Sequence, residues 1–365
     1  MKAGPPRPRG RGAASNPPNR FEPIRLEPDA DWNPDEDPLP RTQFFKDHSR
    51  AIIAYNDSPD VGFEASVNPY RGCEHGCIYC YARPFHEYLG FSSGLDFETK
   101  IMVKEDAPEL LRNELSSPRW KPRVIAMSGV TDCYQPVERR LKLTRACLKV
   151  LAEFRNPVAI VTENFLVTRD VDLLSELARH QAAAVYISLT ALDTELRKVM
   201  EPRTSPPAAR LEAIKRLSQA GIPAGVLVAP VIPGLTDHEI PALVAAAAVA
   251  GAKFAAHAAL RLPHAVAPLF GQWLATHFPE KRDKVLNRIR VLHGGKFHDA
   301  EFGRRMRGEG IFADQISQMF HVACRRAGLS GQGPELSASA FRRPAGPQLE
   351  FGLAALIQTG PDARA

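Results

Sequence analysis

Three cysteines lie within eight residues of one another in the segment NPYRGCEHGCIYCY, which covers residues 68–81. Cys73, Cys77 and Cys80 have the spacing C-x3-C-x2-C, with a glycine at positions 72 and 76. Because glycine lets the backbone turn tightly, the loop can wrap so that three thiolates point at one object. Zinc and iron–sulfur clusters are the partners that thiolates prefer. A metal or cluster site is therefore expected, since a polar, glycine-punctuated loop is a poor place for unrelated buried cysteines.

Three thiolates are one ligand too few for a closed four-ligand site, and this shortage separates two kinds of site. A zinc site would take its fourth ligand from His86, in a C-x3-C-x2-C-x5-H spacing, or from His75. A [4Fe–4S] cluster held by three cysteines would instead leave one iron open to a small molecule. The remaining cysteines are dispersed, and Cys147 and Cys324 are expected in the core.

Composition places the chain among folded globular proteins, with 44% hydrophobic and 24% charged residues in a length of 365. There are 47 Lys and Arg against 41 Asp and Glu, which gives a net charge of +6. No apolar run approaches the roughly 18 residues of a membrane span. The start of the chain lacks the apolar stretch of a secretory signal. We therefore expect a cytoplasmic protein without a membrane partner, and the reducing compartment argues against disulfides among the clustered cysteines.

Six short apolar runs alternate with stretches of helical periodicity in the middle of the chain. They show little alternation of apolar and polar residues, as expected for parallel strands covered on both faces. The pattern predicts an α/β fold with a parallel sheet, although periodicity does not say whether the sheet curls into a barrel. The runs are Ala65–Asn68, Val124–Met127, Val158–Thr162, Val185–Leu189, Gly225–Ala229 and Phe254–Leu260.

The two ends of the chain differ in composition from this middle part. Residues 1–40 are expected to be a disordered leader whose first half is basic and whose second half is acidic. The strand–helix units fill residues 41–263, and residues 264–330 are predicted to be a wholly helical, basic extension. Within it, residues 281–326 hold 11 Lys and Arg against 5 Asp and Glu. Residues 331–365 are expected to be a mostly loose tail.

The cysteine loop resembles the cluster motif of radical S-adenosylmethionine (SAM) enzymes, in which an aromatic residue precedes the third cysteine, as Tyr79 does here. Four later segments are similar to a bacterial branch of that superfamily related to spore photoproduct lyase and described as DNA repair photolyase-like. The resemblance covers roughly residues 40–330. The segments are TDCYQP at 131–136, EPR at 201–203, PVIPG at 230–234 and LRLP at 260–263.

The resemblance implies two cofactors, a [4Fe–4S] cluster and SAM. In such enzymes three cysteines hold three irons, which here would be the task of Cys73, Cys77 and Cys80, and SAM chelates the fourth. The reduced cluster cleaves SAM, and the resulting radical removes a hydrogen atom from the substrate. The implied fold is a partial (β/α)6 TIM-type barrel with a helical C-terminal extension and its site at the carboxyl ends of the strands. An electron donor such as flavodoxin or ferredoxin is the implied partner.

The resemblance also assigns SAM contacts to residues that follow the strands. A guanidinium fork suits a carboxylate, and hydroxyl and carboxylate groups suit an ammonium or a ribose. Each of these residues, taken alone, could equally be a strand-end cap or part of a surface ion pair. They are Ser128, Gly129, Thr131 and Asp132 for the amino group, Ser188 for ribose or carboxylate, Arg203 for the carboxylate, and Tyr79 beside the adenine.

Two positions depart from the family pattern. Where relatives commonly have Thr-Lys-Asn after the third strand, this chain has Glu163 in place of the lysine. Spore photoproduct lyase also carries a hydrogen-donating cysteine after its second strand, and the nearest thiol to that place here is Cys133. Cys133 is therefore a candidate hydrogen donor with Tyr134 as a candidate relay, and an inert Cys133 is the alternative.

Three hypotheses for the substrate remain open at this point. The first is a radical SAM enzyme acting on nucleic acid, with DNA as partner and a damaged or modified base as substrate. The kinship with the lyase and the basic residues 281–326 motivate it, since such residues can neutralise phosphates. The second is a radical SAM enzyme acting on a protein or small metabolite. The third is an iron–sulfur or zinc protein without turnover, and for none of the three does the sequence state the oligomeric state.

Overall fold

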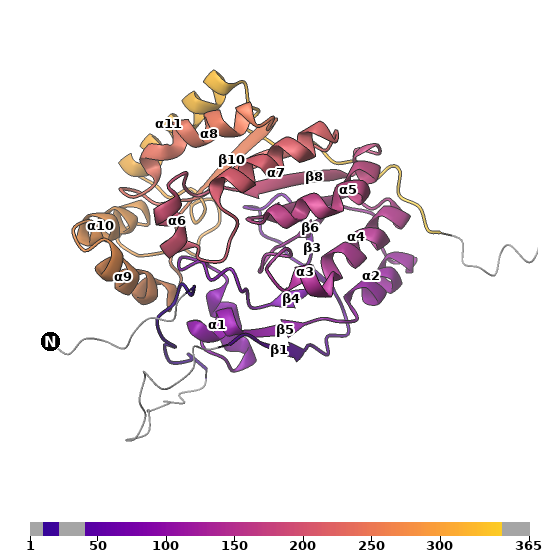
Figure 1. Ribbon diagram of the computed structural model, residues 1–365, viewed down its shortest axis with the longest axis horizontal. Helices are drawn as coiled ribbons and strands as arrows, with labels where there is room; N and C mark the ends of the chain where they lie inside the picture. Colours follow the sequence, from indigo (N-terminus) through magenta and orange to yellow (C-terminus); the bar gives the residue numbers. More distant parts are fainter. Residues whose placement is uncertain (1–9, 22–40, 345–365) are drawn as a thin grey trace, which may run out of the picture.

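Seven strands form the central sheet of the computed structural model, which describes residues 10–21 and 41–344 (Figure 1). Their order is β10-β9-β8-β7-β6-β3-β2, and every neighbouring pair is parallel except β2 with β3. The strands are β2 (Ile53–Tyr55), β3 (Ala65–Val67), β6 (Ile125–Met127), β7 (Val158–Thr162), β8 (Ala183–Ser188), β9 (Ala224–Val231) and β10 (Phe254–Ala259).

The six parallel strands confirm the α/β expectation. They coincide with the six apolar runs, because strands covered on both faces need apolar residues on both. Within the described residues the sheet is open, since β10 and β2 are its two edges and do not pair with each other.

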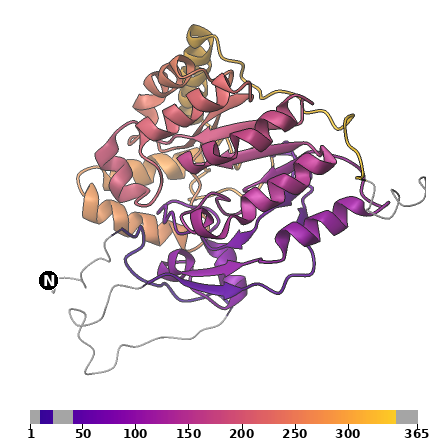
Figure 2. The ribbon, with the colours of Figure 1, turned by 45° about the vertical axis from the view of Figure 1, so that its right-hand side comes forward.

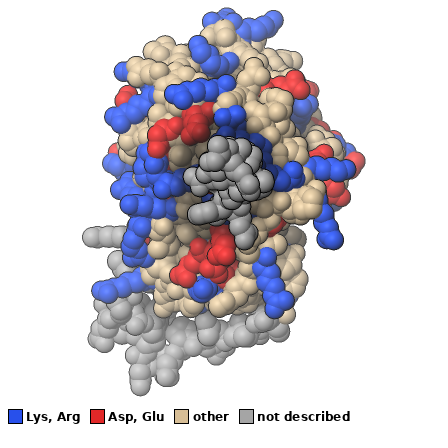
Figure 3. Space-filling view, turned by 90° about the vertical axis from the view of Figure 1, so that its right-hand side faces the viewer, with Lys and Arg blue, Asp and Glu red and all other residues tan. Residues whose placement is uncertain are grey.

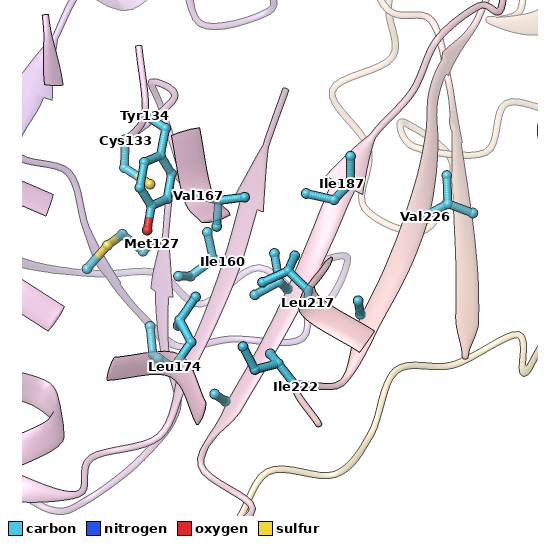
Figure 4. Close-up of a cluster of buried hydrophobic side chains, with 14 of the residues drawn as sticks. Met127, Cys133, Tyr134, Ile160, Val167, Leu174, Ile187, Leu217, Ile222 and Val226 are labelled. Carbon is cyan, nitrogen blue, oxygen red and sulfur yellow. The ribbon is translucent and has the colours of Figure 1, made fainter. Parts of the chain in front are cut away.

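A row of helices covers one face of this sheet (Figures 1 and 2). Their apolar stripes face the strands; in α4, for example, residues at helical spacing from Cys147 to Phe154 are buried. Figure 4 shows part of the core between the two layers. The helices of the row are α2 (Ala107–Ser116), α4 (Leu143–Phe154), α5 (Val171–Ala178), α7 (Pro207–Gln219) and α8 (Ile240–Val249).

A small second sheet, which the sequence analysis did not anticipate, supports the cysteine loop. Its order is β1-β5-β4, with β1 parallel and β4 antiparallel to β5. The strand β4 has only two residues and leads directly into the loop, so no periodicity could reveal it. The strands are β1 (Gln43–Lys46), β4 (Tyr70–Arg71) and β5 (Lys100–Val103), and short helices η1 (Arg83–Leu89), α1 (Leu95–Thr99), α3 (Glu138–Leu141), η2 (Phe165–Asp170), α6 (Thr194–Met200) and η3 (Asp237–Glu239) fill the connections.

The C-terminal extension is helical only in part. It contains α9 (Val266–His277), α10 (Arg282–Leu292) and α11 (Ile311–Ala327), but residues 293–310 form turns. The expectation of wholly helical structure is wrong there because five glycines between 294 and 310 adopt positive φ, which ends helices. No helix in the described ranges is long and apolar enough to cross a membrane.

Parts of the leader and the tail lie against the body, where the sequence analysis expected disorder. Residues 10–21 pack beside the cysteine loop, and Ala13 is 2% exposed. In the tail, Arg342 N donates to Phe154 O at 2.9 Å, and Phe341 contacts Phe154 with a ring separation of 6.1 Å. Buried backbone and side-chain contacts hold these segments despite their Pro- and Gly-rich composition. The rest of both ends, residues 1–9, 22–40 and 345–365, lies outside the described residues.

A half-buried histidine on the edge strand β10 packs against α11. The His257 ring lies 4.3 Å from that of Phe320, centroid to centroid. Burial, and then the charges of His321 and Arg307, lower the pKa of His257 to about 4. His257 and Asp314, which lies in the first turn of α11, line one surface pocket. Since a histidine in an unfolded chain titrates near pH ~6.5, the folded protein binds fewer protons than the unfolded chain between these two pH values.

Stability is therefore expected to fall as the pH decreases from about 6.5 towards 4, and His257→Gln should remove part of this loss. The difference between variant and unaltered protein should amount to about 2 kcal/mol in the change of unfolding free energy between pH ~7.5 and ~4.5. Urea unfolding at the two pH values measures it. Parallel losses in both proteins would show that His257 does not cause the acid sensitivity.

Candidate functional site

The cysteine loop runs from β4 to η1 at the carboxyl edge of the parallel sheet. Cys73 and Cys77 are buried and Cys80 is half-buried, and all six cysteines of the chain are free thiols. Gly72 has φ +78°, and a Cβ there would come within 3.0 Å of two carbonyl oxygens. Gly76 has φ +69°, with the carboxylate of Glu98 at 2.7 Å from the place of a Cβ. Both glycines are thus required by the path of the loop.

The three thiols of the loop lie close enough to interact, because, in addition to burial, the charge of Cys80 raises the pKa of both Cys73 and Cys77. Their thiolate donors fit an iron–sulfur cluster, whereas a closed zinc site would need a fourth ligand. Among the described residues, three other possible metal ligands, His75, Asp132 and Glu163, have donor atoms within 4.8 Å of one another.

Burial favours the protonated form of the three cysteines. It raises the pKa of Cys73 and Cys77 well above the ordinary value and that of Cys80 to about 11. Cys77 Sγ donates a hydrogen bond to Glu163 Oε2 at 3.1 Å. Because a metal binds the thiolate, loading of the site must release protons.

Acidic side chains gather beside the loop. Asp132 Oδ2 lies 3.4 Å and Glu163 Oε2 lies 3.9 Å from Nδ1 of His75. The His75 ring is 1% exposed, its Nδ1 has no hydrogen-bond partner, and burial lowers its pKa. Burial and then the nearby Glu201 raise the pKa of Glu163 to about 7. This cluster of side chains therefore suits a cationic group, which would relieve the repulsion between the carboxylates.

Asp132 also shapes the end of β7. Its Oδ1 and Oδ2 accept hydrogen bonds from Thr162 Oγ1 at 2.8 and 3.0 Å, and Oδ2 accepts from Glu163 N at 2.8 Å. Asn164 Nδ2 lies 3.1 Å from Nε2 of His75. The segment 162–164, flagged as a departure from the family pattern, thus contacts the cysteine loop directly.

A buried ion pair ties the loop to the strands on its other side. Tyr79 is 6% exposed, and its hydroxyl donates to Glu201 Oε1 at 2.6 Å. Glu201 pairs with Arg210 of α7, both 1% exposed. Although burial alone would raise it, Arg210 holds the pKa of Glu201 below its usual value. Arg210 Nη1 also donates to the carbonyl of Ser188, at the end of β8, at 3.0 Å.

The predicted SAM-binding residues after β6 line one side of the loop. Ser128 has φ +85°, and its Oγ accepts from Cys133 N at 2.9 Å. Gly129 O accepts from the hydroxyl of Tyr81 at 2.8 Å. Thr131 Oγ1 donates to Tyr70 O at 3.0 Å. Asp132 lies on the same side of the loop, and the hydroxyls of Ser128 and Thr131 each have a structural partner, so a role of these residues in SAM binding stays a prediction.

Two further predicted SAM contacts, Ser188 and Arg203, lie apart from these residues. Ser188 is 5% exposed and donates to Ala229 O at 3.1 Å. Arg203 contacts the loop itself, because its backbone N donates to His75 O at 3.2 Å and its guanidinium lies 3.1 Å from Glu74 Oε1. A carboxylate partner is thus already present at the predicted carboxylate-binding arginine.

Cys133 and Tyr134 point into the hydrophobic core (Figure 4). Both side chains are 0% exposed, and the Tyr134 hydroxyl lies 3.1 Å from Asp170 Oδ2. Burial raises the pKa of both groups well above their ordinary values. In this conformation the structure does not bring them to the thiols of the loop, and their redox role stays a prediction.

Sequence reasoning missed four charged residues of the site, although two of them carried a signal. Arg210 shares a helix face with the apolar Ile214 and Leu217, where a charged residue needs a buried partner. Glu201 belongs to the quoted EPR segment, but only Arg203 was singled out from it. The others, Arg83 and Glu98, became recognisable only from their contacts.

Comparison with known proteins agrees with the geometry. The sequence profile of the radical SAM superfamily matches residues 67–247. An uncharacterized protein of Mycobacterium tuberculosis is 39% identical over 245 residues, which cover 66% of this chain and 71% of that protein. An uncharacterized protein of Methanocaldococcus jannaschii is 32% identical over 184 residues, covering 50% of this chain and 66% of that protein.

Among solved structures, spore photoproduct lyase shares the fold. A variant of that lyase with bound AdoMet and dinucleoside spore photoproduct superposes with a TM-score of 0.54 at 16% identity, covering 78% of each chain. The lyase complexed with dinucleoside spore photoproduct gives a TM-score of 0.53 at 15% identity, with the same coverage. At such low sequence identity the similarity shows a shared fold and nothing about function.

Proposed function

The chain belongs to the radical SAM superfamily, and from that premise we propose that it holds a [4Fe–4S] cluster through Cys73, Cys77 and Cys80 and binds SAM beside it. The observation that carries the proposal is the loop itself. It places three free thiols at the carboxyl edge of a parallel sheet, next to the carboxylates of Asp132 and Glu163. The open sheet of six parallel strands also supports the partial (β/α)6 barrel implied by the resemblance.

The residues around the loop suit a cationic cofactor. SAM carries a sulfonium and an ammonium, and Asp132 and Glu163 would hold the positive charge. Tyr79 and Arg203 would orient the cofactor from the loop and from the segment beyond α6, and Ser128, Gly129, Thr131 and Ser188 keep their predicted roles within this proposal. When bound, cluster and SAM supply the radical that removes a hydrogen atom from the substrate. A flavodoxin or ferredoxin in the cytoplasm is the proposed reductant.

We further propose a nucleic-acid base as the substrate. Aromatic and cationic groups border the loop: Arg261 lies over the Tyr81 ring at 4.5 Å, and Phe85 and Tyr88 are 50% and 67% exposed. Flat, exposed rings next to arginine are typical of surfaces on which bases stack. The related fold of spore photoproduct lyase, which was solved with a dinucleoside photoproduct, adds support.

One observation favours the alternative of a protein or small-metabolite substrate. Arg288 and Arg305 of the basic extension pair with Asp237 and Asp60, two acids from outside it, so these two arginines offer less charge to phosphates than the sequence suggested. Figure 3, which views the molecule from the side of α2, α4 and α5, shows Lys and Arg beside Asp and Glu on that face.

Release of 5′-deoxyadenosine tests the proposed activity. Anaerobically reconstituted, dithionite-reduced protein should release it from SAM, and Cys80→Ala should abolish the release. DNA should bind with an affinity that falls steeply with salt if phosphates contribute. Stoichiometric zinc without labile sulfide would overturn the proposal in favour of a non-catalytic binding protein. Salt-independent or absent DNA binding would favour a protein or small metabolite as the substrate.

A further inference from the structure

A buried arginine just after the third cysteine uses its whole guanidinium on backbone carbonyls and one carboxylate. Arg83 donates from Nε to Cys77 O at 3.0 Å and from Nη2 to Gly76 O at 3.2 Å. Its Nη1 donates to the carbonyls of residues 93 and 94 at 3.2 and 3.0 Å, and Nη2 donates to Glu98 Oε1 at 2.6 Å. All five N–H donors therefore have an acceptor. The side chains of Arg83 and Glu98 are both 0% exposed.

Glu98 also binds residues 11–13, which we call the N-terminal strap, through its carboxylate and its backbone carbonyl. Gly12 N donates to its Oε2 at 3.0 Å and Ala13 N donates to its Oε1 at 2.8 Å. Arg11 Nη1 donates to the backbone carbonyl of Glu98 at 2.9 Å. A Cβ on Gly12 would overlap the carbonyl oxygen of Gly76. The strap thus crosses the cysteine loop at a point where only glycine fits.

These contacts reach two of the three cysteines through the backbone. The carbonyl of Cys77 accepts from Arg83, and Cys73 N donates to the carbonyl of Phe97 at 2.9 Å, one residue before Glu98. A buried ion pair is a poor source of net stability, because desolvation offsets most of its attraction. The N–H donors of Arg83 do, however, set the positions of the four carbonyls that they bind. The arrangement therefore specifies the shape of the loop more than it stabilises the fold.

We propose that Arg83, Glu98 and the N-terminal strap form one positioning unit, which holds the loop in the shape that retains its cluster. Docking of the strap supplies two donors to Glu98, and Glu98 in turn orients Arg83 on the carbonyls of Gly76 and Cys77. The inference rests on the proposed function, since it takes the loop to hold a cluster. Partners of this outer kind commonly change metal affinity by about 10- to 100-fold.

The decisive variant is Gly12→Ala in the full chain, because its Cβ would overlap the carbonyl of Gly76 and displace the strap, while the side chains of Arg83 and Glu98 both remain present. Reconstituted protein is mixed with an iron chelator, and loss of the visible absorbance of the cluster is followed. We expect the variant to lose its cluster about tenfold faster than the unaltered protein. Gly62→Ala is the matched control, because a Cβ there meets nothing within 4 Å and its φ is not positive. It should behave as the unaltered protein does.

Glu98→Gln tests the pair itself by a spectroscopic readout. The electron paramagnetic resonance spectrum of the reduced cluster should change, whereas a purely structural role would leave the spectrum of the folded fraction unaltered. The outcomes are distinguishable. If the unaltered protein takes up no iron and sulfide, the proposed function fails and this inference with it. If it holds a cluster that Gly12→Ala loses no faster than Gly62→Ala does, the positioning unit is overturned while the proposed function stands.

Discussion

Cys77→Ala is expected to reduce the iron and acid-labile sulfide of the reconstituted protein to background. Cys77 sits at the centre of the loop, is 7% exposed and has Glu163 at 3.1 Å from its sulfur. With this thiolate removed, two cysteines remain for a cluster that needs three protein ligands and one open iron, so we expect assembly to fail outright. Iron and sulfide analysis after anaerobic reconstitution measures the effect.

Cys147→Ala is the matched control for this loss. Its thiol is equally buried, at 0% exposure, but lies on the apolar face of α4, away from the loop. The variant should keep its iron and sulfide. Cys133→Ala should keep them too, since that side chain faces the core. Full iron loading in Cys77→Ala would contradict the assignment of the ligands.

Arg210→Met is expected to lower the free energy of unfolding of the metal-free protein by about 3–5 kcal/mol. The change leaves Glu201 buried at 1% exposure without its cationic partner. It also removes donors to the carbonyls of Ser205 and Ser188, at 2.8 and 3.0 Å. Because Glu201 accepts from Tyr79 of the loop, the loss should loosen the loop as well. Urea unfolding of the metal-free protein measures the effect.

Two comparisons isolate the buried charge in this measurement. Arg210→Met combined with Glu201→Gln should recover much of the loss, because no uncompensated carboxylate remains. Arg216→Met breaks the exposed pair with Glu212 on the same helix and should cost less than about 1 kcal/mol. If Arg210→Met and Arg216→Met unfold at the same urea concentration, the argument from burial is wrong.

The regular spacing of apolar residues along the chain made part of the fold predictable from the sequence. The six parallel strands and helices such as α4 followed from apolar residues at regular spacing, because burial on two faces or on one stripe imposes that spacing. The small sheet that supports the loop was missed, because β4 has two residues and pairs with β5, some thirty residues further along the chain. The packing of the N-terminal strap against the body was missed as well. The strap is held by hydrogen bonds from Gly12 and Ala13 to Glu98, which lies 86 and 85 residues further along the chain.

By itself the sequence determined the chemistry at the centre of this protein. The identity and spacing of Cys73, Cys77 and Cys80 are local properties, and thiolates at that spacing select a narrow range of cofactors. Only the tertiary structure decided what surrounds them. Arg83 pairs with Glu98, 15 residues further along the chain, and Arg210 pairs with Glu201, 9 residues before it, without any periodicity that links the partners. Arg288 and Arg305 of the basic extension pair with Asp237 and Asp60, which lie outside it. The contribution of a buried charged side chain depends on the partner with which it pairs in the folded protein. Local sequence patterns do not show which residue that partner is.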